Sequence, residues 1–165
     1  MSVANLTSIA LLGLAIAFLA RICWTDFFYL KIWNRDLTTL LAITLLFLVV
    51  SWPADLLLRL AFSAILFALG FVFWLLHALG AGDVKLFGIV GALIGSTDAL
   101  IFVGLILLFA LAMVAVFRKV EYLRLVPHLA GSRVVELAST GRMPYGVPIS
   151  LATIALVLPK IYGGF

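Results

Sequence analysis

The sequence predicts an all-α polytopic membrane protein, a bundle of six transmembrane helices that forms one domain over residues 1–165, with both termini outside. Three observations support this: composition, apolar runs and the placement of basic residues. Of the residues, 66% are hydrophobic and only 11% are charged, and the mean hydropathy is +1.32. A soluble domain of this length has too much surface to hide so many apolar side chains, whereas a bilayer is itself an apolar solvent.

The apolar residues fall into six runs. A bilayer core of about 30 Å needs roughly 20 helical residues to cross it. The fourth run is short and is interrupted by Gly88, Gly91 and Gly95, so hydropathy alone allows five or six spans. The runs are Val3–Ile22, Leu37–Ser51, Leu56–Leu79, Val84–Gly95, Ala99–Phe117 and Pro144–Leu158.

The basic residues decide the number of spans. With six spans and the N-terminus outside, only Arg59 and Lys160 face outward. If the fourth run did not cross, the loop after the fifth would carry five basic residues outside, against the positive-inside rule. This pattern also explains the net charge of +4 without a nucleic-acid partner. The other nine of the eleven basic residues then lie inside: Arg21, Lys31, Arg35, Lys85, Arg118, Lys119, Arg124, Arg133 and Arg142.

The glycines of the fourth run form a stripe of small residues. Gly91 and Gly95 have GxxxG spacing, and Gly88 lies one turn before Gly91. Such a stripe lets another helix backbone approach closely. The pattern predicts that the fourth helix is an interior element of the bundle.

Five of the seven acidic residues have simple structural interpretations. Asp36, Asp55 and Asp98 precede apolar runs, where a carboxylate can cap the helix that follows. Glu121 and Glu136 lie in the basic inner loop and are expected to face water.

The two remaining acidic residues, Asp26 and Asp83, are candidates for function. Asp26 follows the first span among apolar and aromatic residues, and Asp83 lies between the third and fourth spans. The six-span topology places both at the inner side of the membrane. An ionisable group near the centre of a membrane helix costs about 2–3 kcal/mol, so it usually lines a polar cavity or meets a partner. Lys85 is two positions from Asp83 and does not face it on a helix; we expect it to reach lipid headgroups or a peptide ligand.

Two neighbouring carboxyl groups can hydrolyse a peptide. They cannot both ionise cheaply, so one keeps its proton near neutral pH. The ionised group then takes a proton from water, and the protonated group polarises the scissile carbonyl. Gly80 and Gly82 permit unusual dihedrals and close approach of a substrate, although Gly-Ala-Gly can also simply form a turn. No cofactor or metal is predicted, because the two histidines and one cysteine lack ligand spacing.

Three motifs resemble those of the type IV prepilin peptidases. The segment Gly80–Leu86 resembles the family's GxGD motif in its GxGDxK form. Asp26 with the downstream Ile32–Asn34 resembles the first catalytic aspartate and the Ile-Pro-Asn that follows it, with Trp33 in place of proline. Met143–Pro148, at the start of the last span, is similar to a third signature.

The resemblance implies roles for individual residues. Asp26 and Asp83 would be the catalytic aspartates, Gly80 and Gly82 would shape the site, and Lys85 would support it. The substrate would be a prepilin or pseudopilin, whose short basic leader is removed at the cytoplasmic face of the bacterial inner membrane. Partners would be this substrate and the lipid bilayer, with other pilus-assembly proteins as further candidates.

Several finer expectations accompany the resemblance. Bifunctional members carry paired cysteines and also N-methylate the pilin, whereas this chain has Cys23 alone; it resembles the short branch that serves Flp/Tad-type pili. Asp36, Glu121 and Glu136 are candidates to attract the basic leader. His77 is expected to be a packing or interface residue more than a modulator of the aspartates.

Two other functions are compatible with the residues alone. In a small transporter or ion-conducting subunit, Asp26 and Asp83 would relay protons or bind a cation. In a structural subunit of a secretion complex, neither would be needed for activity.

Overall fold

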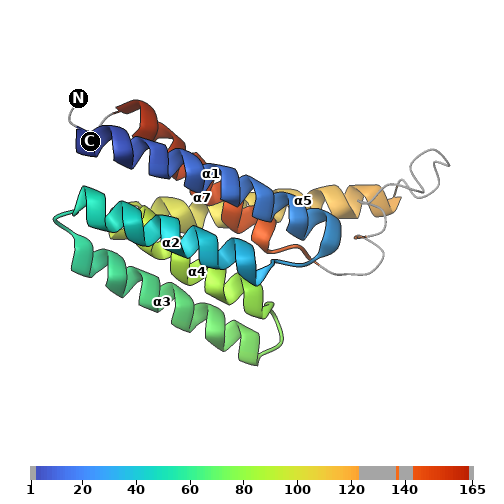
Figure 1. Ribbon diagram of the computed structural model, residues 1–165. Helices are drawn as coiled ribbons and strands as arrows, with labels where there is room; N and C mark the ends of the chain where they lie inside the picture. The colour runs from blue at the N-terminus through green and yellow to red at the C-terminus, as the bar shows by residue number, and fades with distance from the viewer. Residues whose placement is uncertain (1–2, 123–136, 138–142, 164–165) are drawn as a thin grey trace.

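The computed structural model describes residues 3–122, 137 and 143–163, and over this part of the chain it is helical apart from short turns (Figure 1). No strand occurs in these residues, so the all-α prediction is confirmed for them. The first helix begins and the last one ends at the same end of the bundle (Figure 1). The elements are α1 (Val3–Tyr29), α2 (Asn34–Ser51), α3 (Leu56–Leu75), α4 (Ala81–Ile94), the 3-10 turn η1 (Ser96–Asp98), α5 (Ala99–Tyr122) and α7 (Gly146–Gly163).

The lengths and surfaces of the helices identify a membrane protein. Among the described residues, α1, α2, α3 and the η1–α5 segment are long and apolar enough to cross a bilayer, and α7 is a shorter apolar helix. Large apolar side chains point outward, such as Leu57 at 81% and Leu100 at 88% exposure. Such surfaces require an apolar solvent. Helix α4 has only 14 residues, so the number of six crossings stays a prediction.

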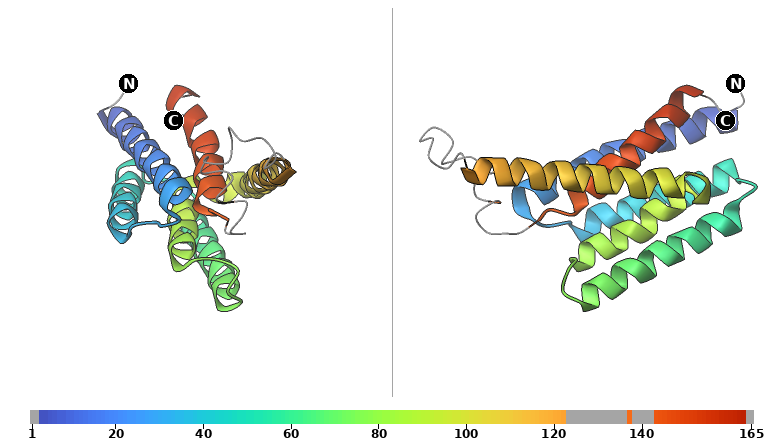
Figure 2. Two further views of the ribbon diagram at one scale, coloured as in Figure 1. Left: turned by 90° about the vertical axis from the view of Figure 1, so that its right-hand side faces the viewer. Right: turned by 180° about the vertical axis from the view of Figure 1, so that it is seen from behind.

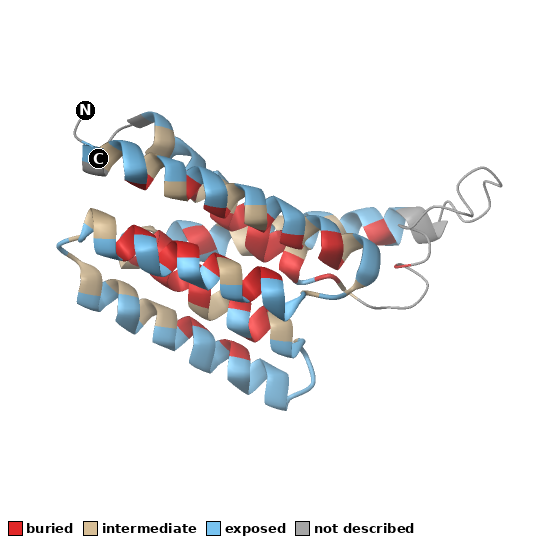
Figure 3. Ribbon diagram, in the orientation of Figure 1, coloured by how far each residue is buried: buried red, intermediate tan, exposed pale blue. Residues whose placement is uncertain are grey.

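Helix α4 lies at the centre of the bundle. It packs against α2, α3 and α7, while α1 packs against α2 and α7. Figure 3 shows that α4 is buried over most of its length, whereas α3 is largely exposed. Helix α3 packs chiefly on α4, and α5 chiefly on α7, so α3 and α5 lie on separate sides of the central helices (Figure 2).

The glycine stripe explains the close packing of α3 on α4. A Cβ added to Gly91 would lie 2.8 Å from Ser63 Cα, and one added to Gly88 would lie 3.3 Å from the Phe67 ring. The Ser63 hydroxyl donates a hydrogen bond of 2.6 Å to the carbonyl oxygen of Gly88. The prediction of an interior fourth helix is therefore confirmed.

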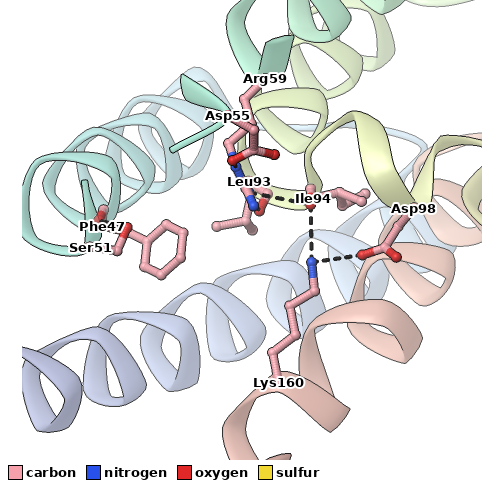
Figure 4. Close-up of polar contacts among 8 residues, drawn as sticks. All are labelled: Phe47, Ser51, Asp55, Arg59, Leu93, Ile94, Asp98 and Lys160. Atoms are coloured by element: carbon pink, nitrogen blue, oxygen red, sulfur yellow. Dashed lines mark hydrogen bonds and ion pairs between the residues drawn. The ribbon is translucent and has the colours of Figure 1, made fainter. Parts of the chain in front are cut away.

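Two cations satisfy the last carbonyl groups of α4 (Figure 4). Arg59 Nη1 donates to the carbonyl oxygens of Leu93 and Ile94 at 3.2 and 3.3 Å. Lys160 Nζ donates to the same Ile94 oxygen at 3.0 Å. Helix C-termini leave carbonyl groups without intrahelical partners, so these contacts from α3 and α7 let the short α4 end inside the bundle.

Asp55 and Asp98, both predicted to cap the helices that follow them, form ion pairs, and for Asp55 the predicted cap is absent. Asp55 occupies the N-cap position of α3 but makes no capping hydrogen bond with its side chain. It instead accepts a hydrogen bond of 2.8 Å from Arg59 Nε, and Asp98 pairs with Lys160 at 2.8 Å. Arg59 and Lys160, the two basic residues that the sequence predicts to face outward, thus belong with these two acids to one polar cluster at this end of the molecule.

Asp36 also departs from its predicted capping role. It lies in the first turn of α2, where Trp33 is the N-cap residue. Its carboxylate is 2% exposed and accepts hydrogen bonds from Arg21 Nε at 3.1 and 3.2 Å. The pair joins α1 to α2, so Asp36 is not available to attract a basic peptide.

Candidate active site

Asp26 lies on the inward face of the last turns of α1. The predicted first run ends at Ile22, but the helix continues to Tyr29, so Asp26 is a helical residue. Its side chain is 5% exposed. Leu30 ends the helix with a φ of +50°, and its N–H donates to the carbonyl oxygen of Asp26 at 2.9 Å.

Asp83 lies in the first turn of α4. The N–H of Gly80, the N-cap residue, donates to Asp83 Oδ2 at 3.0 Å. A Cβ added to Gly80 would approach the same oxygen to 3.1 Å. The side chain is 8% exposed, and the positive end of the α4 dipole favours a negative charge there.

The structure brings the two carboxyl groups into one pocket of about 530 Å³. Asp26 Oδ2 and Asp83 Oδ1 are buried without a hydrogen-bond partner in the described part of the chain, as is Ser150 Oγ. The charge of Asp26 acts on Asp83. Among the described residues, no lysine or arginine lines the pocket. Its other described lining residues are Leu30, His77, Ala78, Leu79, Gly80, Met143 and Tyr145.

The amino end of α7 holds Asp26 much as the amino end of α4 holds Asp83. The backbone amides of Gly146 and Val147 face the Asp26 carboxyl group. A Cβ added to Gly146 would lie 2.9 Å from Asp26 Oδ2. Only a glycine therefore allows this approach, and each carboxyl group lies at the positive end of a helix dipole.

Ile32 connects the two helix ends that hold the aspartates. Its side chain lies against Gly82 of α4 and Gly146 of α7, where an added Cβ would come within 3.0 Å of Ile32 Cβ and 2.8 Å of Ile32 Cδ1, respectively. The connection between α1 and α2 thus sets the spacing of α4 and α7. Gly82 is needed for this packing, whereas the sequence motif alone suggests only a role near the substrate.

A hydrogen bond also links the start of α2 to α4. Lys85 Nζ donates to Asn34 Oδ1 at 3.0 Å. It therefore does not neutralise the aspartates, in agreement with the sequence prediction, but its contact is with Asn34 instead of the lipid headgroup or peptide ligand that the sequence suggests. Trp33 has φ −77° and ψ 133°, a conformation that proline also adopts. Trp33 therefore has backbone dihedrals that the proline usual in the resembling motif could also adopt.

Sequence reasoning misses three features of the site. His77 lines the pocket with a φ of +58°, a location that the sequence, which favours a packing or interface residue, does not predict. Gly146 and Ile32 have no assigned role in the sequence, although both lie within motifs that resemble the family's signatures. A glycine at the start of an apolar run is the signal that could have identified Gly146.

Other candidate roles concern metal binding and the leader. The described residues contain no group of three or more histidine, cysteine, aspartate or glutamate side chains that could hold a metal ion. The side chains of Glu121 and Glu136, the remaining acidic candidates for attracting a leader, lie outside the described residues.

Comparison with known proteins supports the interpretation of these motifs. Residues 13–117, more than half of the chain, match the model of the type IV leader peptidase family. The matched segment contains Asp26 and Asp83, while the motif around Gly146 lies beyond it. Neither the comparison with curated proteins nor that with solved structures gives a match. The chain belongs to the type IV leader peptidase family, which implies that it is a peptidase.

Proposed function

We propose that this protein is an aspartyl endopeptidase that removes the basic leader of Flp-type prepilins or pseudopilins at the cytoplasmic face of the bacterial inner membrane. One observation carries the proposal. Asp26 and Asp83 each present a buried oxygen without a partner to a shared pocket, and none of its described lining residues is a lysine or arginine.

This arrangement supports a two-aspartate hydrolysis. Because the carboxyl groups are buried together, one stays protonated. The ionised group takes a proton from a water molecule, whose oxygen attacks the scissile carbonyl carbon, while the protonated group donates to the carbonyl oxygen. The tetrahedral intermediate collapses as the C–N bond breaks, and the amine leaves with the proton that was taken from water. A hydroxyl proton of the intermediate returns to the other aspartate, so the pair again holds one proton. The N–H groups at the amino ends of α4 and α7 hold the aspartates in place throughout.

The arrangement of the helices supports six crossings with both termini outside. The turns that follow α1 and α3 lie at one end of the bundle, opposite the start of α1 and the end of α7 (Figure 1). This is the end that carries nine of the eleven basic residues in the six-span topology, and the positive-inside rule makes it cytoplasmic. Helix α4, with 14 residues, is about 21 Å long. Because α4 is shorter than the bilayer core, Asp83 at its amino end lies at the inner edge of the membrane or just inside it.

The proposal predicts cleavage by addition of water. The purified wild-type protein, incubated in detergent with a synthetic Flp-type prepilin in H₂¹⁸O, should release one leader peptide. Mass spectrometry should find one ¹⁸O atom in the new leader carboxyl terminus. Ion flux in proteoliposomes without any cleavage would instead support the transporter, and absence of both activities would leave a structural subunit.

We also predict that Lys85 supports the site through Asn34. Lys85→Met and Asn34→Ala should each lower kcat by about three- to tenfold, the range expected from the loss of one hydrogen bond. The double variant should be no slower than either single variant, because the two side chains act through one contact. If Lys85 bound the leader directly, Lys85→Met alone would raise KM and the two effects would multiply.

A further inference from the structure

A second, apolar groove adjoins the pocket of the aspartates. It has a volume of about 450 Å³ and lies between α3 and α5. Phe87 of α4 and Pro148 and Ile149 of α7 form its floor. Its walls are Phe73 of α3 and, on α5, Val103, Ile106, Leu107 and Ala110.

The groove exists because α3 and α5 pack on different helices. Helix α3 packs chiefly on α4, and α5 chiefly on α7. The view along the bundle shows the two helices on separate sides of α4 and α7 (Figure 2). In a membrane, the groove therefore opens toward the lipid acyl chains.

The groove and the pocket of the aspartates share three lining residues, Ala78, Leu79 and Tyr145. An occupant of the groove would thus reach the carboxyl groups without crossing another helix. On α5, the distance from Val103 to Ala110 is about two helical turns, or roughly 10 Å. The groove offers an apolar surface of that length, and it meets the polar pocket at Tyr145.

A different groove, between α2 and α3, offers a contrast. It is larger, about 640 Å³, and lies over α4. It shares no lining residue with the pocket of the aspartates, and the residues at one of its ends, Asn34 and Lys85, are hydrogen-bonded to each other. Its apolar walls suit lipid, but it lacks continuity with the site.

We propose that the groove between α3 and α5 binds the apolar helical segment that follows the scissile bond of the substrate. This inference rests on the proposed function. The substrate helix enters sideways from the bilayer and lies on Phe87 and Ile149. Its first residues pass Tyr145, which brings the junction between the leader and the helix to Asp26 and Asp83. The basic leader continues on the far side of the pocket, toward the cytoplasm.

One pair of substitutions on α5 tests this placement. Ala110→Phe puts a ring into the groove, whereas Ala112→Phe makes the same change on an exposed residue that lines neither groove. Residues two apart on a helix do not share a face. With a full-length membrane prepilin, Ala110→Phe should raise KM by about tenfold or more, the loss expected when a few buried side chains no longer bind. Ala112→Phe and Thr38→Phe, the latter in the α2–α3 groove, should behave as wild type.

Photocrosslinking provides an independent measurement. A benzoylphenylalanine at Leu107 should crosslink to the apolar segment of an uncleaved prepilin in an Asp83→Asn background, and one at Leu45 in the other groove should not. Equal kinetics for Ala110→Phe and Ala112→Phe, or a crosslink from Leu45 alone, would overturn the assignment while the peptidase stands. If wild type cleaves no prepilin at all, it is the proposed function that fails.

Discussion

Cleavage of a prepilin leader is expected to fall by about 10³-fold or more when either Asp26 or Asp83 is replaced by asparagine. General acid–base catalysis typically contributes a factor of about 10²–10⁴ to the rate. In the proposed mechanism one aspartate is the general base and the other is the general acid. Asparagine has nearly the same size and can accept a hydrogen bond in place of the carboxylate, but it neither takes a proton from water nor donates an acidic one. Leader removal after co-expression, followed by a shift in gel mobility of the pilin, measures the effect.

A carboxylate at the opposite end of the bundle is the matched control. Asp98 pairs with Lys160 near the last turn of α4, and Asp98→Asn should leave cleavage close to wild type. The melting temperatures of Asp26→Asn and Asp83→Asn should not fall below that of wild type, because burying an amide costs less than burying a charge. Full cleavage by either active-site variant would refute the pairing of the aspartates.

The global character of the fold can be predicted from composition and charge. Apolar runs identify the helices because each must satisfy its backbone hydrogen bonds internally in a bilayer. The ends of the runs are less reliable: α1 continues past Ile22 to Tyr29, since Trp24, Phe27 and Phe28 extend the apolar helix through a segment whose acidic and basic residues interrupt the hydropathy pattern. The contacts of polar residues in turns are the least predictable. Asp55 pairs with Arg59 one turn along α3 instead of capping the helix, and Asp98 pairs with Lys160 of α7.

The site is predictable where its chemistry is local in sequence and unpredictable where helix packing creates it. The contact between Gly80 and Asp83 lies within one motif, so the sequence suggests it. The approach of Gly146 to Asp26 joins the last helix to the first, and it depends on how α7 packs against α1. Ile32 likewise acquires its role only when α4 and α7 meet around it. Hydropathy contains no information about such contacts.

The close approach of Gly146 to Asp26 leads to the second large expected effect. Gly146→Ala should lower kcat by about 10–100-fold, because misplacing a catalytic group by about 1 Å costs up to that much. The new Cβ would lie 2.9 Å from Asp26 Oδ2, well inside van der Waals contact, and the carboxyl group must move away. Alanine is intrinsically preferred over glycine in helices by about 1 kcal/mol. If Gly146 served only the helix, Gly146→Ala would therefore leave the stability of the protein unchanged or raise it.

The same Cβ would also crowd Ile32 Cδ1 at 2.8 Å, and a second substitution separates the two effects. Ile32→Val removes that methyl group, so the double variant should recover the thermal stability that Gly146→Ala loses to this contact. It should not recover kcat, because the approach to Asp26 is unchanged. Gly104→Ala, where an added Cβ meets nothing within 4 Å, is the control and should match wild type in both measurements. Recovery of kcat together with stability would mean that Gly146 only makes room for Ile32, and that the amino end of α7 does not position the catalytic carboxyl group.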